Sequence, residues 1–268
     1  MKTDYPVIQA DILIIGGGSA GSMAAIRAKE LNPKQEVVVF EKGDMKYSGS
    51  IARGMDALNI VAVPGVSDPE TYVEAMDIHC DGVFDTPVSY KLANRSWELM
   101  KKLESWGVCF PTDKKGNYDI LKGHPKGKFI MTMKEPELKT KLHKRCVELG
   151  VRIINRIMAV RLLKTGNDVT GAIGINVRSG EIIVCQSKAV IMCNGGTSRF
   201  GLPGNGNLYG IYDFPGNTGD GYCLALNAGA ELSGFEYTVT YYIVKDINAP
   251  LLFITLTRGA QLFNAIGD

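Results

Sequence analysis

Apolar positions near the start of the chain come in two short uninterrupted runs, with a segment of helical spacing between them. Residues 12–15 and residues 37–40 contain only valine, isoleucine, leucine and phenylalanine, which is typical of parallel strands covered on both faces. Residues 19–31 between them are rich in alanine and follow a helical pattern. The pattern therefore predicts a strand, a helix and a second strand of one parallel sheet.

Helical spacing returns twice further along the chain. Asp85, Thr86 and Pro87 form a helix-start signal, and another helix is expected from about Pro136 to Gly150, which suits a left-handed cap. The apolar face predicted for the earlier helix consists of Val88, Leu92, Leu99, Leu103 and Trp106. The apolar face predicted for the later helix consists of Leu138, Leu142 and Cys146.

Strand-like runs dominate the region after this later helix. Turn residues at 166–168 and 178–180 separate them, which predicts an antiparallel meander. The strands expected there are residues 151–154, 158–163, 169–177 and 182–185. A further short buried strand, residues 189–193, runs into Asn194 and Gly195, an abrupt ending that mirrors the end of the first strand.

The turn between the first strand and the first helix carries three glycines at a spacing typical of dinucleotide-binding proteins. Gly16 permits a tight turn, Gly18 leaves the backbone amides open to a pyrophosphate, and Gly21 lets the helix lie close to the strand. Glu41 lies at the end of the second strand, where its carboxylate can accept hydrogen bonds from a ribose diol. The alternative interpretation is that Glu41 is an ordinary surface residue after a strand. Strand, turn, helix and acid together predict that a dinucleotide binds here.

A second glycine-rich stretch lies late in the chain. Residues 201–216 are rich in Gly, Asn, Pro and Tyr and are expected to form a long loop, after which residues 217–221 open a helix that runs through Gly229. Asp220 lies near the amino end of this helix, where amides and a carboxylate together suit a ribityl chain or a phosphate. The same aspartate could instead be an ordinary helix cap.

Composition and charge argue against several classes of protein and of binding site. The formal net charge of the 268 residues is +2, and basic and acidic residues are interspersed, which argues against nucleic-acid binding. No stretch has the apolar length of a membrane span or the core of a signal peptide, so a cytoplasmic location is expected. The six cysteines are scattered without a CxxC pair, which argues against a metal or iron–sulfur site and favours free thiols.

These motifs together resemble the fumarate reductase and succinate dehydrogenase flavoprotein superfamily. The shared segments are the glycine turn, Glu41, SGSIARG at 48–54, CNGG at 193–196, NTGDG at 217–221 and AGAEL at 228–232. Within it the chain is most similar to alpha subunits of dissimilatory adenylylsulfate reductase. That similarity is carried by SGSIARGMDALN at 48–59, LESWGV at 103–108, FEY at 235–237 and the pair Lys245 and Asp246.

The resemblance implies an α/β fold and FAD rather than NAD. The expected fold is a Rossmann-like FAD-binding domain, residues 1–235, in which an antiparallel β-meander is inserted into a parallel sheet; residues 236–268 then begin a capping domain. Backbone at Ala159 and Val160 would hold the adenine. The other FAD-binding residues implied by position are Gly16, Gly18, Ser19, Ala20, Gly21, Glu41, Lys42, Ser48, Gly49, Ser50, Asn194, Gly195 and Asp220.

Several positions depart from the family pattern. The histidine that bonds covalently to the flavin in some fumarate reductases is absent from residues 48–54, which implies noncovalent FAD. Ile243 and Tyr237 stand where adenylylsulfate reductases have an arginine and a histidine, which argues against adenylylsulfate as the substrate. Asn59 matches a substrate-facing asparagine. Arg53 replaces a glutamine near the flavin, where it could stabilise a reduced anionic flavin, contact the pyrophosphate or lie on the surface.

The resemblance predicts the flavin-binding part of an FAD-dependent oxidoreductase that acts on a small-molecule substrate. Family members continue beyond the cap, so either the chain is a fragment or another polypeptide completes the site. Because the chain has no cysteine cluster, a separate iron–sulfur protein would carry single electrons. Two other interpretations remain open: a non-catalytic flavin-binding or electron-relay module, and an NAD-dependent dehydrogenase, which shares the glycine turn.

Overall fold

The computed structural model describes residues 5–53, 57–122, 124, 126–134, 137–197, 214, 216–234, 255, 259–261 and 263–267. The described residues divide into two compact units. The first is built from Met1–Arg53 and Glu137–Leu232, and the second is built mainly from Gly54–Pro136. The assignment of residues 1–235 and 236–268 to two domains stays a prediction.

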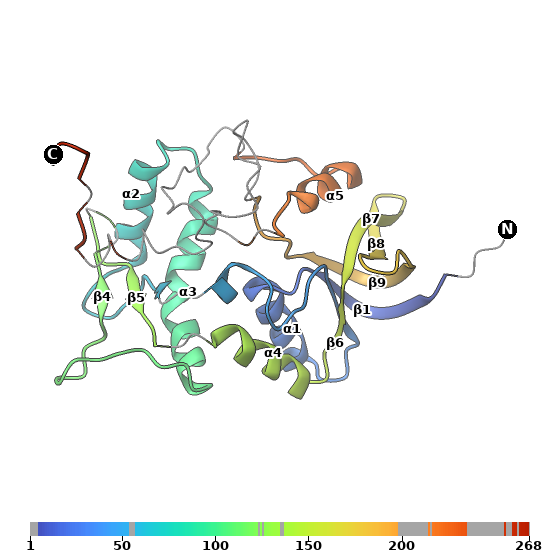
Figure 1. Cartoon of the computed structure of the whole chain (residues 1–268), viewed down its shortest axis with the longest axis horizontal. Helices are drawn as coiled ribbons and strands as arrows, with labels where there is room; N and C mark the ends of the chain where they lie inside the picture. Colours follow the sequence, from blue (N-terminus) through green and yellow to red (C-terminus); the bar gives the residue numbers. More distant parts are fainter. Residues whose placement is uncertain are drawn as a thin grey trace. The chain divides into compact units, whose positions relative to one another are not determined.

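A six-stranded sheet organises the first unit (Figure 1). Its strands are β1 (Val7–Ile15), β2 (Val37–Glu41), β6 (Arg152–Asn155), β7 (Ile157–Thr165), β8 (Asp168–Asn176) and β9 (Ile182–Met192). The strand order is β6-β2-β1-β9-β8-β7; β6, β2, β1 and β9 pair in parallel, whereas β7, β8 and β9 pair antiparallel. The predicted parallel sheet with an antiparallel meander is confirmed.

Apolar residues of the central strands build the core of this unit. All five residues of β2 are buried, and Leu13, Val38, Phe40, Ala172 and Cys185 belong to one cluster that joins β1, β2, β8 and β9. Burial of this kind contributes about 25 cal/mol per Å² of apolar surface and is the main stabilising term. The sheet is therefore a rigid frame for the loops that leave its strands.

Two helices of the first unit pack side by side, α1 (Ser19–Leu31) and α4 (Leu138–Glu148) (Figure 1). The limits of α1 match the predicted helix. The predicted apolar face of α4 is also confirmed, because Leu138, Leu142 and Cys146 are at most 3% exposed, and Gly150 has a φ of 73° beyond its end. A third helix, α5 (Asp220–Ala228), lies against β7.

Strand β9 corrects one prediction. The sequence predicts two strands, residues 182–185 and residues 189–193, on either side of Gln186, Ser187 and Lys188. In the structure a single strand runs through all three residues. The side chain of Gln186 hydrogen-bonds Gln9 at 2.7 Å, and Lys188 forms a 2.7 Å ion pair with Asp11. Cross-strand polar pairs with β1 thus replace apolar contacts, and the strand continues.

The second unit contains two helices and a small antiparallel sheet. The helices are α2 (Pro69–His79) and α3 (Thr86–Ser105), and the sheet has the order β3 (Ala57–Asn59), β5 (Ile130–Thr132) and β4 (Ile120–Leu121). The start of α3 was predicted correctly, because the Asp85 side chain accepts a 2.9 Å hydrogen bond from the amide of Val88. Helix α2 and the three strands were not predicted.

The apolar face predicted for α3 is wrong in its first half, while Leu99, Leu103 and Trp106 are partly buried. Leu92 is 68% exposed and Val88 is 49% exposed, whereas Ala93, Ser96 and Met100 are buried. The buried Ser96 hydroxyl accepts hydrogen bonds from two backbone amides of the 61–62 segment, at 2.8 and 3.1 Å. Small side chains let the helix approach that segment closely, so side-chain size and hydrogen bonding select the buried face together with hydrophobicity.

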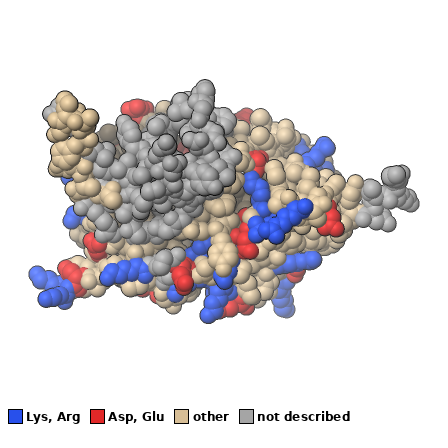
Figure 2. All heavy atoms as spheres, viewed as in Figure 1, with Lys and Arg blue, Asp and Glu red and all other residues tan. Residues whose placement is uncertain are grey.

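The described residues show how charges and cysteines are distributed. Basic and acidic side chains lie intermixed on the face drawn in Figure 2. Among the described residues, no helix is both long and apolar enough to cross a membrane. In the same residues Cys146 and Cys185 are buried free thiols, as expected, while Cys109 and Cys223 are exposed, and no three His, Cys, Asp or Glu side chains gather as a metal site would require.

Candidate functional site

A cavity of about 510 Å³ opens in the first unit where β1, β2 and β9 end and where α1 and α5 begin. Carboxyl ends of parallel strands are the usual ligand site of such sheets. The cavity volume lies in the range of cofactor pockets. Predicted residues that line it are Gly16, Gly18, Ser19, Ala20, Glu41, Lys42, Ser48, Gly49, Ser50, Ala159, Asn194, Gly195 and Asp220.

Three predicted residues, Gly21, Val160 and Asn59, are not among the described residues that line the cavity. Gly21 lies at the contact between α1 and β1, and Val160 is 39% exposed on β7. Arg53 is the last residue of the short 3-10 helix η1 (Ser50–Arg53), whose first residue does line the cavity. Asn59 is exposed at the end of β3 in the second unit. The catalytic roles expected for Arg53 and Asn59 stay predictions.

The glycine turn has the geometry that its spacing predicts. Gly16 has a φ of 99°, and a Cβ at this position would lie 2.3 Å from the carbonyl oxygen of Cys193. A Cβ on Gly21 would lie 1.8 Å from the carbonyl oxygen of Gly16. Gly18 differs, because its Cβ would meet nothing closer than Gly49 Cα at 3.9 Å. Two glycines are therefore needed for packing, and the third leaves space in the cavity wall.

The carboxylate of Glu41 organises the base of the cavity. Its Oε2 accepts a hydrogen bond from the amide of Gly17 at 2.7 Å, and its Oε1 accepts one from the amide of Gly43 at 2.6 Å. The residue is 6% exposed. A carboxylate offers about four acceptor positions, so the two oxygens can still accept hydrogen bonds from a ribose diol. Sequence reasoning predicted the ribose contact but not these two backbone bonds.

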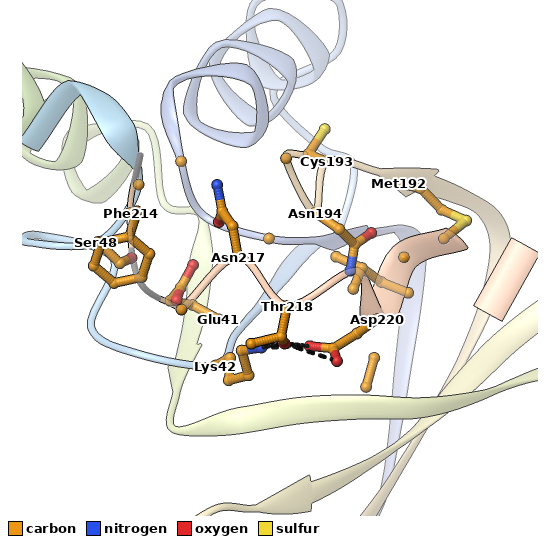
Figure 3. Close-up of a pocket in the computed structure, with 18 of the residues that line it drawn as sticks. Glu41, Lys42, Ser48, Met192, Cys193, Asn194, Phe214, Asn217, Thr218 and Asp220 are labelled. Carbon is orange, nitrogen blue, oxygen red and sulfur yellow. Dashed lines mark hydrogen bonds and ion pairs between the residues drawn. The ribbon is translucent and has the colours of Figure 1, made fainter. Parts of the chain in front are cut away.

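Lys42, Thr218 and Asp220 form a polar cluster that also lines the cavity (Figure 3). The Lys42 ammonium pairs with the Asp220 carboxylate and donates to Thr218 Oγ1 at 2.9 Å. The Thr218 hydroxyl also lies 2.9 and 3.0 Å from the two carboxylate oxygens of Asp220. Gly219, with a φ of 82°, is the N-cap of α5, so Asp220 is not the helix cap. Its carboxylate instead faces the cavity.

Two buried polar atoms in the cavity wall have no protein partner among the described residues. Ser48 Oγ and Asn194 Oδ1 are both inaccessible to solvent and make no hydrogen bond in the structure. Buried polar atoms are nearly always paired, so such atoms indicate a ligand or ordered water. The amino end of α1, which begins at Ser19, adds free amides and a partial positive charge. These donor and acceptor groups fit a dinucleotide with a diphosphate and a ribose.

Several lining residues were not predicted from sequence. Thr218 lies inside the NTGDG segment already identified, so its hydroxyl could have been named with Asp220. Met192 and Cys193 follow from the end of β9, once the strand is known to lie beside β1. Phe214 belongs to the long loop and carries no periodic signal. Burial raises the pKa of the Cys193 thiol, which therefore stays protonated at neutral pH.

Comparison with known proteins gives the same cofactor. The sequence model of a family described as "FAD binding domain" matches residues 11–241. The chain is 26% identical to the alpha subunit of adenylylsulfate reductase of Megalodesulfovibrio gigas, over 96% of this chain and 42% of the relative. It is also 28% identical to the fumarate reductase flavoprotein subunit of Mycobacterium tuberculosis, over 94% of this chain and 42% of the relative.

The fold is shared with a solved structure of the same kind. Adenylylsulfate reductase from Archaeoglobus fulgidus superposes with a TM-score of 0.72 at 27% identity, covering 85% of this chain and 37% of that one. These matches confirm the resemblance to adenylylsulfate reductase alpha subunits and fumarate reductase flavoproteins. The chain spans less than half the length of these two curated relatives.

Proposed function

The chain belongs to the FAD binding domain family, whose cofactor is FAD, and we propose that it is the flavin-binding part of an oxidoreductase of the fumarate reductase and adenylylsulfate reductase type. In this proposal FAD is held without a covalent bond and exchanges electrons with a small substrate. A separate iron–sulfur protein carries the electrons onward. Two relatives are themselves named as subunits, which supports a partner polypeptide.

The observation that carries the proposal is the cavity at the amino end of α1. In our assignment the FAD diphosphate lies on the first-turn amides beside Gly18, where the missing side chain leaves space. Glu41 accepts hydrogen bonds from the adenosine ribose, and the backbone of Ala159, which lines the cavity, contacts the adenine. Ser48 Oγ and Asn194 Oδ1 would gain partners from the bound cofactor.

When bound, the isoalloxazine ring supplies the two-electron chemistry, and the protein residues bind and orient it. Ser48 and Gly49 line the cavity before η1, and this segment of small residues is assigned to one side of the ring system. The ion pair between Lys42 and Asp220 fixes the position of both side chains in the cavity wall. We assign these two residues to the ribityl and phosphate groups of FAD. Arg53 is assigned to the flavin, and Asn59 is assigned to the substrate.

The first prediction concerns how FAD is held. The purified protein is expected to show a flavin absorption spectrum, and acid denaturation is expected to release the flavin into the supernatant. Folded protein from which FAD has been removed should bind FAD at least tenfold more tightly than NADH, a difference of about 1.4 kcal/mol. Absorption spectroscopy and calorimetric titration measure these outcomes.

Other results would require a different function. A flavin that stays with the precipitate would contradict noncovalent binding, and a protein that binds NADH but not FAD would support a nicotinamide-dependent dehydrogenase instead. The protein could also bind FAD that is neither oxidised nor reduced by any dicarboxylate or sulfonucleotide, even when a partner iron–sulfur protein is present. That result would indicate a non-catalytic flavin module.

A further inference from the structure

A buried lysine lies behind the glycine turn. Lys139 is in the first turn of α4, is 2% exposed, and its Nζ donates a 3.0 Å hydrogen bond to Ser22 Oγ in the first turn of α1. Ser22 is fully buried, and its hydroxyl donates at 3.3 Å to the carbonyl oxygen of Gly17. The amide of Gly17 in turn donates to Glu41. Hydrogen bonds on either side of Gly17, joined by its backbone, thus connect the ammonium to Glu41 in the cavity.

The position of this ammonium lowers the stability of the protein when no ligand is bound. A buried charge without a counter-ion is destabilising, and Lys139 forms no ion pair with a carboxylate of the described residues. The lysine also lies beside the first turn of α1, which is the positive end of that helix. Lys139 is thus unfavourable in two ways, as a buried charge without an ion pair among the described residues and as a positive charge near the positive end of a helix. Such arrangements are expected at functional sites, where a bound ligand offsets their free-energy cost.

The ionisable groups around Lys139 come from several elements. The carboxylates of Glu41 and Asp44, on β2 and the loop that follows, attract the ammonium, but neither forms an ion pair with it among the described residues. Burial raises the pKa of Cys146 to about 11 and lowers the pKa of His143, so both are neutral near pH 8. Burial also lowers the pKa of Lys139 to about 8, so the lysine changes charge there.

We propose that the Lys139 ammonium balances the charge of the FAD diphosphate from behind the glycine turn, so that FAD binding and protonation of Lys139 favour each other. The inference rests on the proposed function, because the diphosphate is assigned to the amino end of α1. Lys139 acts through Ser22 and the backbone of Gly17 and is therefore a positioning residue. The proton that it gains when FAD binds comes from the solvent.

The sign of the pH dependence follows from linkage. Below pH 8 the free protein already carries the proton, and FAD binds without proton uptake. Above pH 8 the free protein has lost the proton and must regain it to bind FAD, so affinity falls as pH rises. The dissociation constant of the wild-type protein for FAD is therefore expected to increase roughly tenfold between about pH 7 and pH 9.

The test compares wild-type protein with Lys139→Met and the matched control Lys144→Met. Lys144 is on the same helix, and its side chain is 79% exposed, so the control removes the same charge from the surface. Lys139→Met is expected to bind FAD about tenfold more weakly than wild type at neutral pH and to show no change with pH. Lys144→Met should behave as wild type. Titration of the apoproteins with FAD by calorimetry measures all three.

Proton uptake gives a readout that needs no variant. Calorimetry at pH 8.5 in two buffers of different ionisation enthalpy is expected to show proton uptake when wild-type protein binds FAD. Wild-type protein that binds FAD with no uptake and no pH dependence would overturn the role of Lys139 and leave the proposed function intact. Wild-type protein that fails to bind FAD at any pH would overturn both. Equal losses in Lys139→Met and Lys144→Met would also contradict the inference.

Discussion

Replacement of Gly21 by alanine is expected to destabilise the protein by about 3 kcal/mol, because the new Cβ overlaps backbone that has no room to move. The Cβ would lie 1.8 Å from the carbonyl oxygen of Gly16 and 3.3 Å from Ile14 Cγ2. Relief requires α1 to move away from β1, which displaces the amides assigned to the diphosphate. Urea denaturation measures the loss of stability, and FAD titration should show no binding at micromolar concentrations.

The matched control is Gly18→Ala. Its Cβ meets only Gly49 Cα at 3.9 Å, and its backbone, at φ −63° and ψ −165°, is open to alanine. This variant should unfold at the wild-type urea concentration but bind FAD at least roughly tenfold more weakly, because the methyl group blocks close approach of the diphosphate. Equal stability of Gly21→Ala and wild type would contradict the packing role of Gly21. Unchanged FAD binding in Gly18→Ala would contradict the assigned place of the diphosphate.

Glu41→Ala is expected to lose both stability and FAD binding. Removal of the carboxylate leaves the amides of Gly17 and Gly43 without their 2.7 and 2.6 Å partners, at a cost of roughly 2 kcal/mol or more. The same change removes the proposed acceptor for the ribose diol. Urea denaturation and FAD titration measure the two effects on the same protein.

Glu41→Gln separates the two roles of the side chain. Glutamine keeps the length of the side chain and one acceptor oxygen, so one of the two backbone hydrogen bonds remains and the loss of stability should be smaller than in Glu41→Ala. Hydrogen bonds to a charged acceptor are about twice as strong as neutral ones, so FAD binding should still weaken. If Glu41→Gln binds FAD as wild type does, the carboxylate serves only the backbone turn, and the ribose lies elsewhere.

The parts of the fold that sequence predicted well are those decided by local rules. The first strand, α1 and β2 follow from an uninterrupted apolar run, a glycine spacing and a helical pattern that lie within 41 residues of the amino terminus. The buried face of α4 follows from residues four apart. Helix α2 also carried local signals that were not recognised, Asp68 as cap and Pro69 as first residue.

Other features depend on partners that are distant in sequence. The continuity of β9 depends on pairs between Gln186 and Gln9 and between Lys188 and Asp11, on another strand. The buried face of α3 depends on two backbone amides that bond Ser96. The approach of Lys139 to Ser22 spans 117 positions. No periodicity within one segment contains this information, because it arises only when the segments pack.

The central claim is that the FAD diphosphate lies on the backbone amides at the amino end of α1. A crystal structure of the protein with FAD tests it most directly. Diphosphate oxygens are expected within about 3 Å of first-turn amide nitrogens beside Gly18, with the carboxylate of Glu41 hydrogen-bonded to the adenosine ribose. A diphosphate bound elsewhere, with the first turn of α1 left in contact with solvent, would contradict the claim.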